Sequence, residues 1–467
     1  MGGTRVRTVV VVGGGIAGLS AAHELVAAGH DVLVLEGSPQ VGGKLRRAPV
    51  AGVTVDVGAE AMLNRRPEGV DLARALGLPI EHPTLAASKI WTRGALRPLP
   101  RSLMGVPLDL PGLEASGVLS AEGMERVRAE VDVPASVIEG DVSVGELVDA
   151  RFGPEVTDRL VEPLLGGVYA GHARLLSARA SVPQLVAFAE RGSMTEQAAA
   201  IPTTYDAPVF AGITGGMGLL TETLAGELSS RGAAVRTGAT VRALRRTDAG
   251  WAVTVGPTTD PEEVAADAVV LAVPAAPAAR LLADAVPAAA TELAAMEAAS
   301  VVVVTFAFAA SAVPGLAATD SSGFLVPPVD GRRVKASTFS FAKWGWVRAA
   351  GAAGGEDLLF LRTSLGRHRE EVALQASDDE LVAWSLADLR EAVGLTAAPV
   401  DTHVQRWGGG LPQYAIGHLD RVARVRAAVA GVPGLAVCGA PYDGVGIPAV
   451  IGSAHRAVAA ILETTAV

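Results

Sequence analysis

The amino-terminal part of the chain contains the feature that most restricts its fold: a short apolar strand, three spaced glycines and a helix. Thr8–Val12 is a run of β-branched residues, which is typical of a buried parallel strand. Gly13, Gly15 and Gly18 follow with G-x-G-x-x-G spacing, and residues 19–29 continue as an amphipathic helix. A second apolar strand completes the unit. This order of elements predicts a Rossmann-like α/β fold.

Each position of this motif has a mechanical role in binding a dinucleotide. Gly13 allows the tight turn, Gly15 lets the backbone approach a diphosphate, and Gly18 lets the helix pack closely on the strand. The amino end of the helix offers N–H groups and a positive dipole to the diphosphate. The second strand ends at Glu36, whose carboxylate can accept hydrogen bonds from ribose hydroxyls. A glycine-rich turn without a ligand is the alternative. The residues predicted to bind the dinucleotide are Gly13, Gly15, Ile16, Ala17, Gly18, Glu36 and Gly37.

A second glycine pair, Gly42-Gly43, lies a few residues beyond the acid. Such a pair is not part of a simple NAD fingerprint. It resembles the G-G motif of flavoproteins of the amine oxidase and phytoene desaturase class, where it helps to hold FAD. A surface turn is the alternative, since the segment is rich in turn residues. The resemblance adds to the predicted FAD site Gly43, Lys44, Gly58, Ala59, Glu60 and Ala61.

Length and composition exclude several other classes. A chain of 467 residues is too long for one simple core, so two or three domains are expected. A net charge of −10 and the absence of a Lys/Arg-rich run argue against nucleic-acid binding. The single cysteine, Cys438, excludes an intrachain disulfide, and the eight histidines lack ligand spacing, so no metal is expected. No apolar run approaches the roughly 20 residues of a membrane span, which predicts a cytoplasmic protein.

Two later segments are predicted to return to the nucleotide-binding sheet. Residues 235–241 and 269–273 have the pattern of strands separated by a hairpin. In related flavoproteins the backbone at the position of Val241 meets the adenine, although an ordinary strand valine is the alternative. Near the carboxyl end, a strand reaching Cys438 leads to a helix that begins near Ile447, with Pro448 in its first turn.

The amino end of this last helix is predicted to face the N1/C2=O edge of the flavin. Its positive dipole would stabilise the anionic reduced flavin there. A terminal packing helix after a glycine loop is the alternative. The residues predicted to contact FAD in these later segments are Val241, Trp407, Gly439, Val445, Gly446 and Ile447.

The domain prediction follows from this return of the chain. We predict a discontinuous FAD-binding domain formed by residues 1–88, 205–279 and 405–467. A substrate-binding domain of α+β type is predicted over 89–104 and 280–404, and a helical domain over 105–204.

Four longer motifs narrow the resemblance: VEPLLGGVYAGHARLLSARASVPQL, ITGGMGLLTETLA, WGGGLPQYAIGHLDRV and GAPYDGVGIPAVIGSA. Together they resemble the protoporphyrinogen oxidase family, and within it the coproporphyrinogen III oxidases of Gram-positive bacteria. The resemblance runs over most of the chain. It implies non-covalent FAD and the removal of six electrons from a porphyrinogen in haem biosynthesis. Molecular oxygen would reoxidise the flavin, with three hydrogen peroxide molecules formed.

The same resemblance implies a site with few catalytic acids or bases, because flavin N5 accepts the hydride and the protein positions the macrocycle. No catalytic side chain is assigned. Tyr169 would pack on the macrocycle, or else be a core tyrosine. Gly323 and Leu325 match a glycine and a leucine that face the pyrroles. Lys89 matches a basic residue that forms an ion pair with a substrate propionate, although a solvated surface cation is the alternative.

Arg362 is a charge inside an apolar strand, and such a residue needs a partner. A substrate carboxylate is one hypothesis, and a buried Asp or Glu is the other. Arg179 and His172 are further candidate cations. Because four propionates need more cationic partners than two, coproporphyrinogen is favoured over protoporphyrinogen IX.

More distant alternatives are a FAD amine oxidase, a carotenoid desaturase and a FAD-stabilised binding protein without activity. Cys438, expected in a buried strand, is unsuited to covalent flavin attachment. Transient contact with a ferrochelatase is a further expectation.

Overall fold

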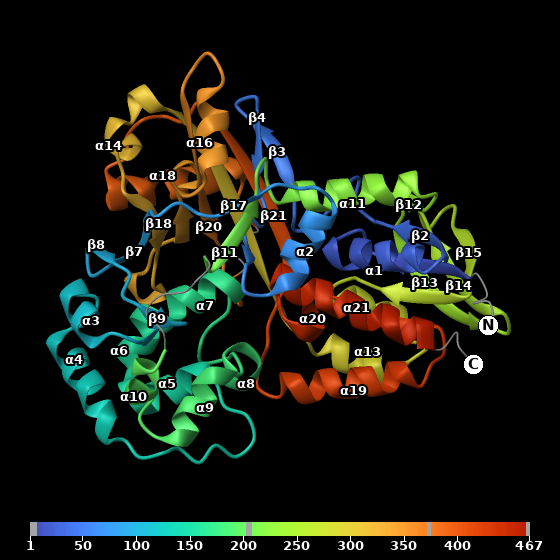
Figure 1. Cartoon of the computed structure of the whole chain (residues 1–467), viewed down its shortest axis with the longest axis horizontal. Helices are drawn as coiled ribbons and strands as arrows, with labels where there is room; N and C mark the ends of the chain where they lie inside the picture. The colour runs from blue at the N-terminus through green and yellow to red at the C-terminus, as the bar shows by residue number, and fades with distance from the viewer. Residues whose placement is uncertain (1–6, 202–207, 371–374, 464–467) are drawn as a thin grey trace.

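The computed structural model describes residues 7–201, 208–370 and 375–463. Two β-sheets and one helical region make up most of it (Figure 1). The five-stranded sheet lies at the right of the figure. The seven-stranded sheet lies at the upper left, and the helices α3 to α10 lie at the lower left.

The five-stranded sheet is parallel throughout and joins three distant parts of the chain. Its order is β12-β2-β1-β16-β22, with β1 at the centre. The predicted α/β class is therefore confirmed. The strands are β1 (Thr8–Val12), β2 (Asp31–Leu35), β12 (Ala234–Arg236), β16 (Ala268–Leu271) and β22 (Leu435–Val437).

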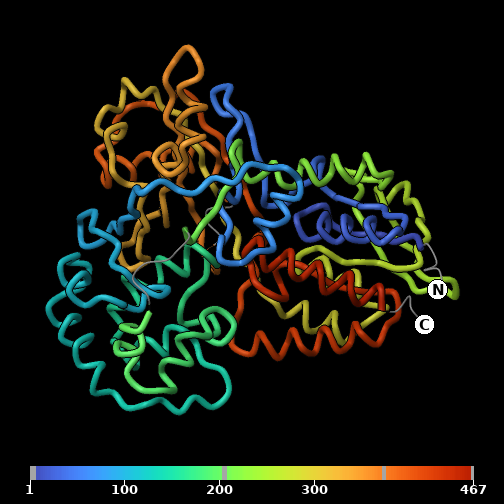
Figure 2. Tube along the Cα trace, in the orientation of Figure 1, coloured from blue at the N-terminus to red at the C-terminus, as the bar shows by residue number. Residues whose placement is uncertain are grey.

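Both faces of this sheet are covered, which explains the unbroken valine run of β1. Val9 and Val11 pack into the core on one face, and Val10 and Val12 into the core on the other. One face carries α1 (Ile16–Ala27), α11 (Gly218–Ser230) and α21 (Ile447–Glu463). The other carries β13 (Val241–Thr247), β14 (Gly250–Val255), β15 (Glu262–Ala266), α12 (Ala275–Leu282), α13 (Pro287–Ala294) and α19 (His418–Ala430). Figure 2 shows the blue α1 and the red α21 side by side.

The seven-stranded sheet has the order β21-β17-β20-β19-β18-β7-β8. Only β18 and β7 are parallel; the other neighbours are antiparallel. Its strands are β7 (Ala87–Thr92), β8 (Ala95–Pro98), β17 (Ala298–Ala309), β18 (Ser321–Leu325), β19 (Val334–Thr338), β20 (Leu358–Leu365) and β21 (Asp401–Pro412). Its helices are α14 (Pro314–Ala317), α15 (Ser340–Lys343), α16 (Gly345–Ala352) and α18 (Asp378–Val393).

Packing divides the chain at slightly different places from the predicted boundaries. Leu281, Leu282 and Leu293 pack beneath the parallel sheet, so α12 and α13 belong with that sheet although the substrate domain was predicted from residue 280. β21 pairs with β17 along the seven-stranded sheet, although residues from 405 onward were predicted to belong to the FAD domain. Apolar packing decides the first assignment, and strand pairing decides the second.

The helical region has its own apolar core, built from α3 to α10. α6 continues through a π-helical segment at Thr157–Val161 into α7. The helices are α3 (Leu110–Ser116), α4 (Ala121–Arg128), α5 (Val144–Phe152), α6 (Pro154–Val156), α7 (Glu162–Tyr169), α8 (Ala178–Ser181), α9 (Pro183–Arg191) and α10 (Met194–Ala199). The remaining elements are β3 (Arg47–Val50), β4 (Val53–Asp56), β5 (Met62–Leu63), α2 (Pro67–Ala75), β6 (Ile80–Glu81), β9 (Ser102–Leu103), β10 (Val106–Pro107), β11 (Phe210–Ile213) and α20 (Ala440–Asp443).

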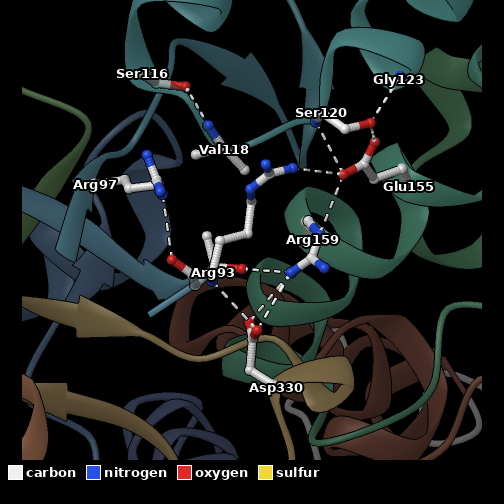
Figure 3. A network of polar contacts seen from close by, with 10 residues as sticks. Arg93, Arg97, Ser116, Val118, Ser120, Gly123, Glu155, Arg159 and Asp330 are labelled. Atoms are coloured by element: carbon white, nitrogen blue, oxygen red, sulfur yellow. Dashed lines mark hydrogen bonds and ion pairs between the residues drawn. The ribbon is translucent and has the colours of Figure 1, made fainter. Parts of the chain in front are cut away.

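A polar network fastens the helical region to the seven-stranded sheet (Figure 3). Arg159, in the π-helical segment, donates to Thr92 Oγ1 over 2.7 Å and pairs with Asp330 at 3.3 Å. The carboxylate of Glu155 lies 3.3 Å from Arg159 Nε and 3.4 Å from Arg93 Nη1. These contacts hold the start of the α6–α7 run against the hairpin between β7 and β8.

Two glycines of the amino-terminal motif are required by the packing of the protein itself. Gly13 has a φ of +108°, and a Cβ there would lie 2.5 Å from Ala272 O. A Cβ on Gly18 would overlap the carbonyl oxygen of Gly13. Close approach of α1 to the end of β1 therefore depends on the missing side chain at residue 18.

We predict that Gly18→Ala lowers the free energy of unfolding by about 1–3 kcal/mol or more, because the new methyl forces α1 away from the turn. Urea unfolding followed by circular dichroism measures this. The matched control is Gly226→Ala, at an exposed position of α11 with no atom within 4 Å of the new Cβ. The control should be neutral or stabilise by up to about 1 kcal/mol. Equal stability of the Gly18→Ala variant and the unmodified protein would contradict the prediction.

Candidate functional site

Gly15 differs from its two neighbours in the motif, because nothing in the protein requires a glycine there. Its φ of −79° and ψ of 179° suit any residue. The nearest atom to a Cβ built on it is Gly43 Cα, at 3.9 Å. Open space in front of Gly15, at the amino end of α1, is the cradle that a dinucleotide diphosphate needs.

The second glycine pair lies against this turn. Gly42 N–H donates to Gly14 O over 2.8 Å, and a Cβ on Gly43 would lie 3.3 Å from Gly15 Cα. Lys44 directly follows this glycine pair. Burial lowers the pKa of its ammonium, and no carboxylate among the described residues offsets this lowering. An anionic ligand beside this partly buried cation would be electrostatically favourable.

Glu36 is fixed at the end of β2 beside the same turn. Its carboxylate accepts hydrogen bonds from Gly14 N and Ser38 N, each over 2.7 Å. Gly37 follows in an exposed position with Thr240 Oγ1 3.5 Å from a Cβ built on it. Val241 begins β13, and its side chain is 6% exposed and packs in the core, so only its backbone can meet a ligand.

The loop after β4 lies between the glycine pair and the seven-stranded sheet. Ala59 N donates to Lys44 O over 2.9 Å, and a Cβ on Gly58 would overlap the same carbonyl oxygen. Trp407 lies on the other side, with its Cζ2 3.3 Å from that Cβ position. Ala61, the last residue predicted here, is half-buried. Gly58, Ala59 and Trp407, which were predicted to contact FAD, are therefore neighbours.

Glu60 is at the centre of a buried charge cluster. Its Oε1 lies 2.8 Å from Lys343 Nζ, and its Oε2 lies 3.0 Å from Arg362 Nη2. Ser340 Oγ donates to Oε2 over 3.1 Å. Burial would raise the pKa of Glu60, but Arg362 and Lys343 hold it at about 2, so the carboxylate is ionised at neutral pH. Asp56, at the end of β4, has a pKa raised by burial to about 6.

The carboxyl-terminal loop returns to the amino-terminal motif, as predicted. Gly439 has a φ of +121°, and a Cβ there would lie 3.8 Å from the Cβ of Ala17. A Cβ on Gly446 would have no atom within 4 Å, so this glycine too borders open space. The preceding Val445 is partly buried against the helical core. α21 begins at Ile447 with Pro448 in its first turn, and Cys438 is completely buried.

Gly15, Gly43 and Gly446 lie in the segments that follow β1, β2 and β22, so all three lie toward the carboxyl edge of the parallel sheet. Such an edge is the usual ligand-binding position in open α/β folds. The residues present therefore fit an extended dinucleotide, and the side chains there could hold FAD.

Three of the residues predicted to contact the substrate, Tyr169, Gly323 and Leu325, lie on α7 and β18. Leu325 Cδ2 is 3.9 Å from a Cβ built on Gly167, and a Cβ on Gly166 would have no neighbour within 4 Å. Tyr169 is 7% exposed and packs against Tyr414, with ring centroids 5.4 Å apart. Gly323 has a φ of +128°, and a Cβ there would overlap Ser337 O.

The predicted cations have protein partners. Lys89 Nζ lies 3.0 Å from Asp320, and the Lys89 side chain is 31% exposed. Arg362 pairs with Glu60, the second kind of partner expected from the sequence, and contact with substrate stays a prediction. Arg179 donates to the carbonyl of Ile138, and the His172 ring bonds to a backbone carbonyl.

Sequence reasoning missed Lys343 and the cluster that it forms with Glu60. Lys343 is one of four lysines, which was a weak signal, but nothing in the sequence links it to a residue 283 positions earlier. Within the described ranges, no group of three or more acidic, His or Cys side chains could hold a metal. None of the described helices has the length and apolar character needed to cross a membrane.

Comparison with known proteins agrees with this geometry. A family model described as flavin containing amine oxidoreductase matches residues 16–462. The chain belongs to this family. The predicted flavin cofactor is thereby confirmed, and the protein is an oxidoreductase.

Individual relatives place the chain more narrowly within the flavin-containing oxidoreductases. It is 38% identical over 472 residues to coproporphyrinogen III oxidase of Mycobacterium tuberculosis, covering 98% of each chain. It is 28% identical over 500 residues to protoporphyrinogen oxidase of Macaca fascicularis, covering 98% of this chain and 99% of the other. A crystal structure from Exiguobacterium sp. 255-15, provisionally described as a protoporphyrinogen oxidase, superposes with a TM-score of 0.85 at 30% identity, covering 99% of this chain and 100% of the other. Membership of the protoporphyrinogen oxidase family is confirmed.

We predict that Gly15→Ala folds normally but binds FAD at least about tenfold more weakly, because the methyl enters the space in front of α1 without clashing with the protein. FAD titration of the apoprotein, followed by flavin fluorescence, measures the Kd. Gly315→Ala is the matched control, since a Cβ at this exposed position of α14 has no neighbour within 4 Å. Unchanged FAD affinity of Gly15→Ala would remove Gly15 from the cofactor site.

Proposed function

We propose that this protein is a FAD-dependent oxidase that converts coproporphyrinogen III to coproporphyrin III in haem biosynthesis. The observation that carries the proposal is the 38% identity, over 98% of both chains, to a protein named coproporphyrinogen III oxidase. The glycine-lined FAD cradle and the open space beside α7 support it. The substrate loses six hydrogen atoms, that is six protons and six electrons, and three molecules of oxygen take them up to give three molecules of hydrogen peroxide.

FAD, when bound, supplies the hydride acceptor for each of the three two-electron steps. The chain contributes binding and orientation. Gly15 and Gly43 would leave room for the diphosphate, and the Glu36 carboxylate would accept hydrogen bonds from the ribose. The amino end of α21, at Ile447, would direct its positive dipole toward the cofactor. We propose that this binding is non-covalent, because Cys438 is completely buried behind the loop.

The macrocycle is proposed to enter between α7 and β18. Leu325 would contact one face of the ring system, and the missing side chains at Gly166 and Gly167 would leave room for its width. Lys89, on β7 next to β18, would pair with a propionate at the exposed rim. Cytoplasmic location and transient transfer of the product to a ferrochelatase belong to the same proposal.

The direct test is turnover of coproporphyrinogen III and protoporphyrinogen IX in parallel, followed by porphyrin fluorescence and oxygen uptake in air. Controls without enzyme are required because both substrates autoxidise. We expect faster turnover of coproporphyrinogen, with three oxygen molecules consumed per porphyrin. The second candidate, protoporphyrinogen IX oxidation, is favoured by the relative from Macaca and would be indicated by the reverse preference. Turnover of neither substrate by FAD-loaded protein would reject both.

We predict that Lys89→Met raises the KM for coproporphyrinogen about five- to tenfold with little change in kcat, because one charged hydrogen bond to a propionate is lost. Asp320→Asn is the matched control, since it breaks the same ion pair while leaving the cation free. Its KM should stay unchanged or fall. An equal rise in both variants would mean that the ion pair only shapes the end of β7.

A further inference from the structure

The buried cluster around Glu60 joins the cofactor region to the seven-stranded sheet. Arg362 projects from the middle of β20, and its side chain is 13% exposed. Glu60 belongs to the loop after β4 and is 8% exposed. Buried charges are expensive to desolvate, so they persist where paired charges and hydrogen bonds compensate.

Arg362 contacts the backbone of the loop as well as its carboxylate. Its Nη1 donates to Gly58 O over 2.6 Å, while its Nη2 lies 3.0 Å from Glu60 Oε2. One planar guanidinium therefore fixes two points of the loop, which an ammonium cannot do in the same way. Lys343, from α15, holds the other carboxylate oxygen of Glu60 at 2.8 Å.

A series of close contacts links Gly58 to Gly15, where the FAD diphosphate is proposed to bind. Ala59 N donates to Lys44 O, and Gly58 has no room for a side chain against the same oxygen. Gly43, beside Lys44, packs against Gly15. A shift of the loop at Gly58 would therefore move the segment that borders the proposed diphosphate position.

We infer that Arg362 is a positioning residue for FAD. Arg362 and Lys343 hold residues 58–60 against the seven-stranded sheet through their contacts with Gly58 and Glu60. This inference rests on FAD as the cofactor and not on the identity of the substrate. It differs from the sequence hypothesis that Arg362 pairs with a substrate carboxylate. The guanidinium already has an ionised partner and a carbonyl acceptor, so a propionate would have to compete with both.

The test measures FAD binding without turnover. Apoprotein of Arg362→Met is titrated with FAD, and flavin fluorescence gives the Kd and the rate of FAD release. We expect a Kd at least about tenfold higher than that of the unmodified protein, since loss of the clamp frees the loop and leaves Glu60 with one cation. The KM for coproporphyrinogen, measured with saturating FAD, should change less than about twofold.

Two further variants separate positioning from general stability. Arg159→Met breaks the network of Figure 3. That network also depends on a partly buried arginine, but it joins the helical region to the seven-stranded sheet and does not involve residues 58–60. The Arg159→Met variant should lower thermal stability while leaving the FAD Kd unchanged. Arg362→Lys keeps the positive charge but loses the two-pronged guanidinium. Its Kd for FAD should lie between those of the unmodified protein and Arg362→Met, and this variant provides the test if Arg362→Met does not fold.

An unchanged FAD Kd in Arg362→Met, or in Arg362→Lys if only that variant folds, would overturn the inference. A raised KM with normal FAD affinity would also overturn it and would favour the substrate-carboxylate hypothesis. Because FAD binding is read without any porphyrinogen, a failure of the proposed substrate would leave this result intact.

Discussion

The architecture depends on one close contact, where α1 crosses the end of β1 at Gly18 and Gly13. Any side chain at residue 18 would overlap a backbone carbonyl, so glycine there is a condition of packing rather than of binding. This contact places the amino end of α1 at the edge of the central strand of the parallel sheet. β2, β16 and the carboxyl-terminal β22 then assemble around that strand, and the loops that follow them meet at the same edge.

Five glycines of the predicted cofactor site illustrate two physical situations. Those at 13, 18 and 58 are required because the chain approaches itself too closely for a Cβ. Those at 15 and 446 have ample room, and their φ values lie outside the left-handed region. Packing does not require glycine at these two positions, whereas the proposed FAD site does, because a side chain there would take up the space proposed for the cofactor.

The contacts of the seven-stranded sheet with the cofactor loop and with the helical region are polar as well as apolar. The Glu60 cluster joins the cofactor loop to β20, and the Arg159 network joins the α6–α7 run to the hairpin after β7. Both use arginine, whose fork can hold a carboxylate and a second oxygen at once. Apolar burial keeps the regions together, while such directional contacts fix how loops from different regions meet.

The sequence by itself determined the βαβ unit, the strand and helix of the last segment and the family, because these depend on local patterns and spacing. Thr8–Val12 and the start of α21 at Ile447 lie where predicted. It could not determine that Arg362 meets Glu60, or that α12 and α13 pack on the parallel sheet although residues from 280 were assigned elsewhere. Those contacts join residues hundreds of positions apart. Tertiary packing alone decides them, since a buried charge takes whichever partner the fold brings within reach.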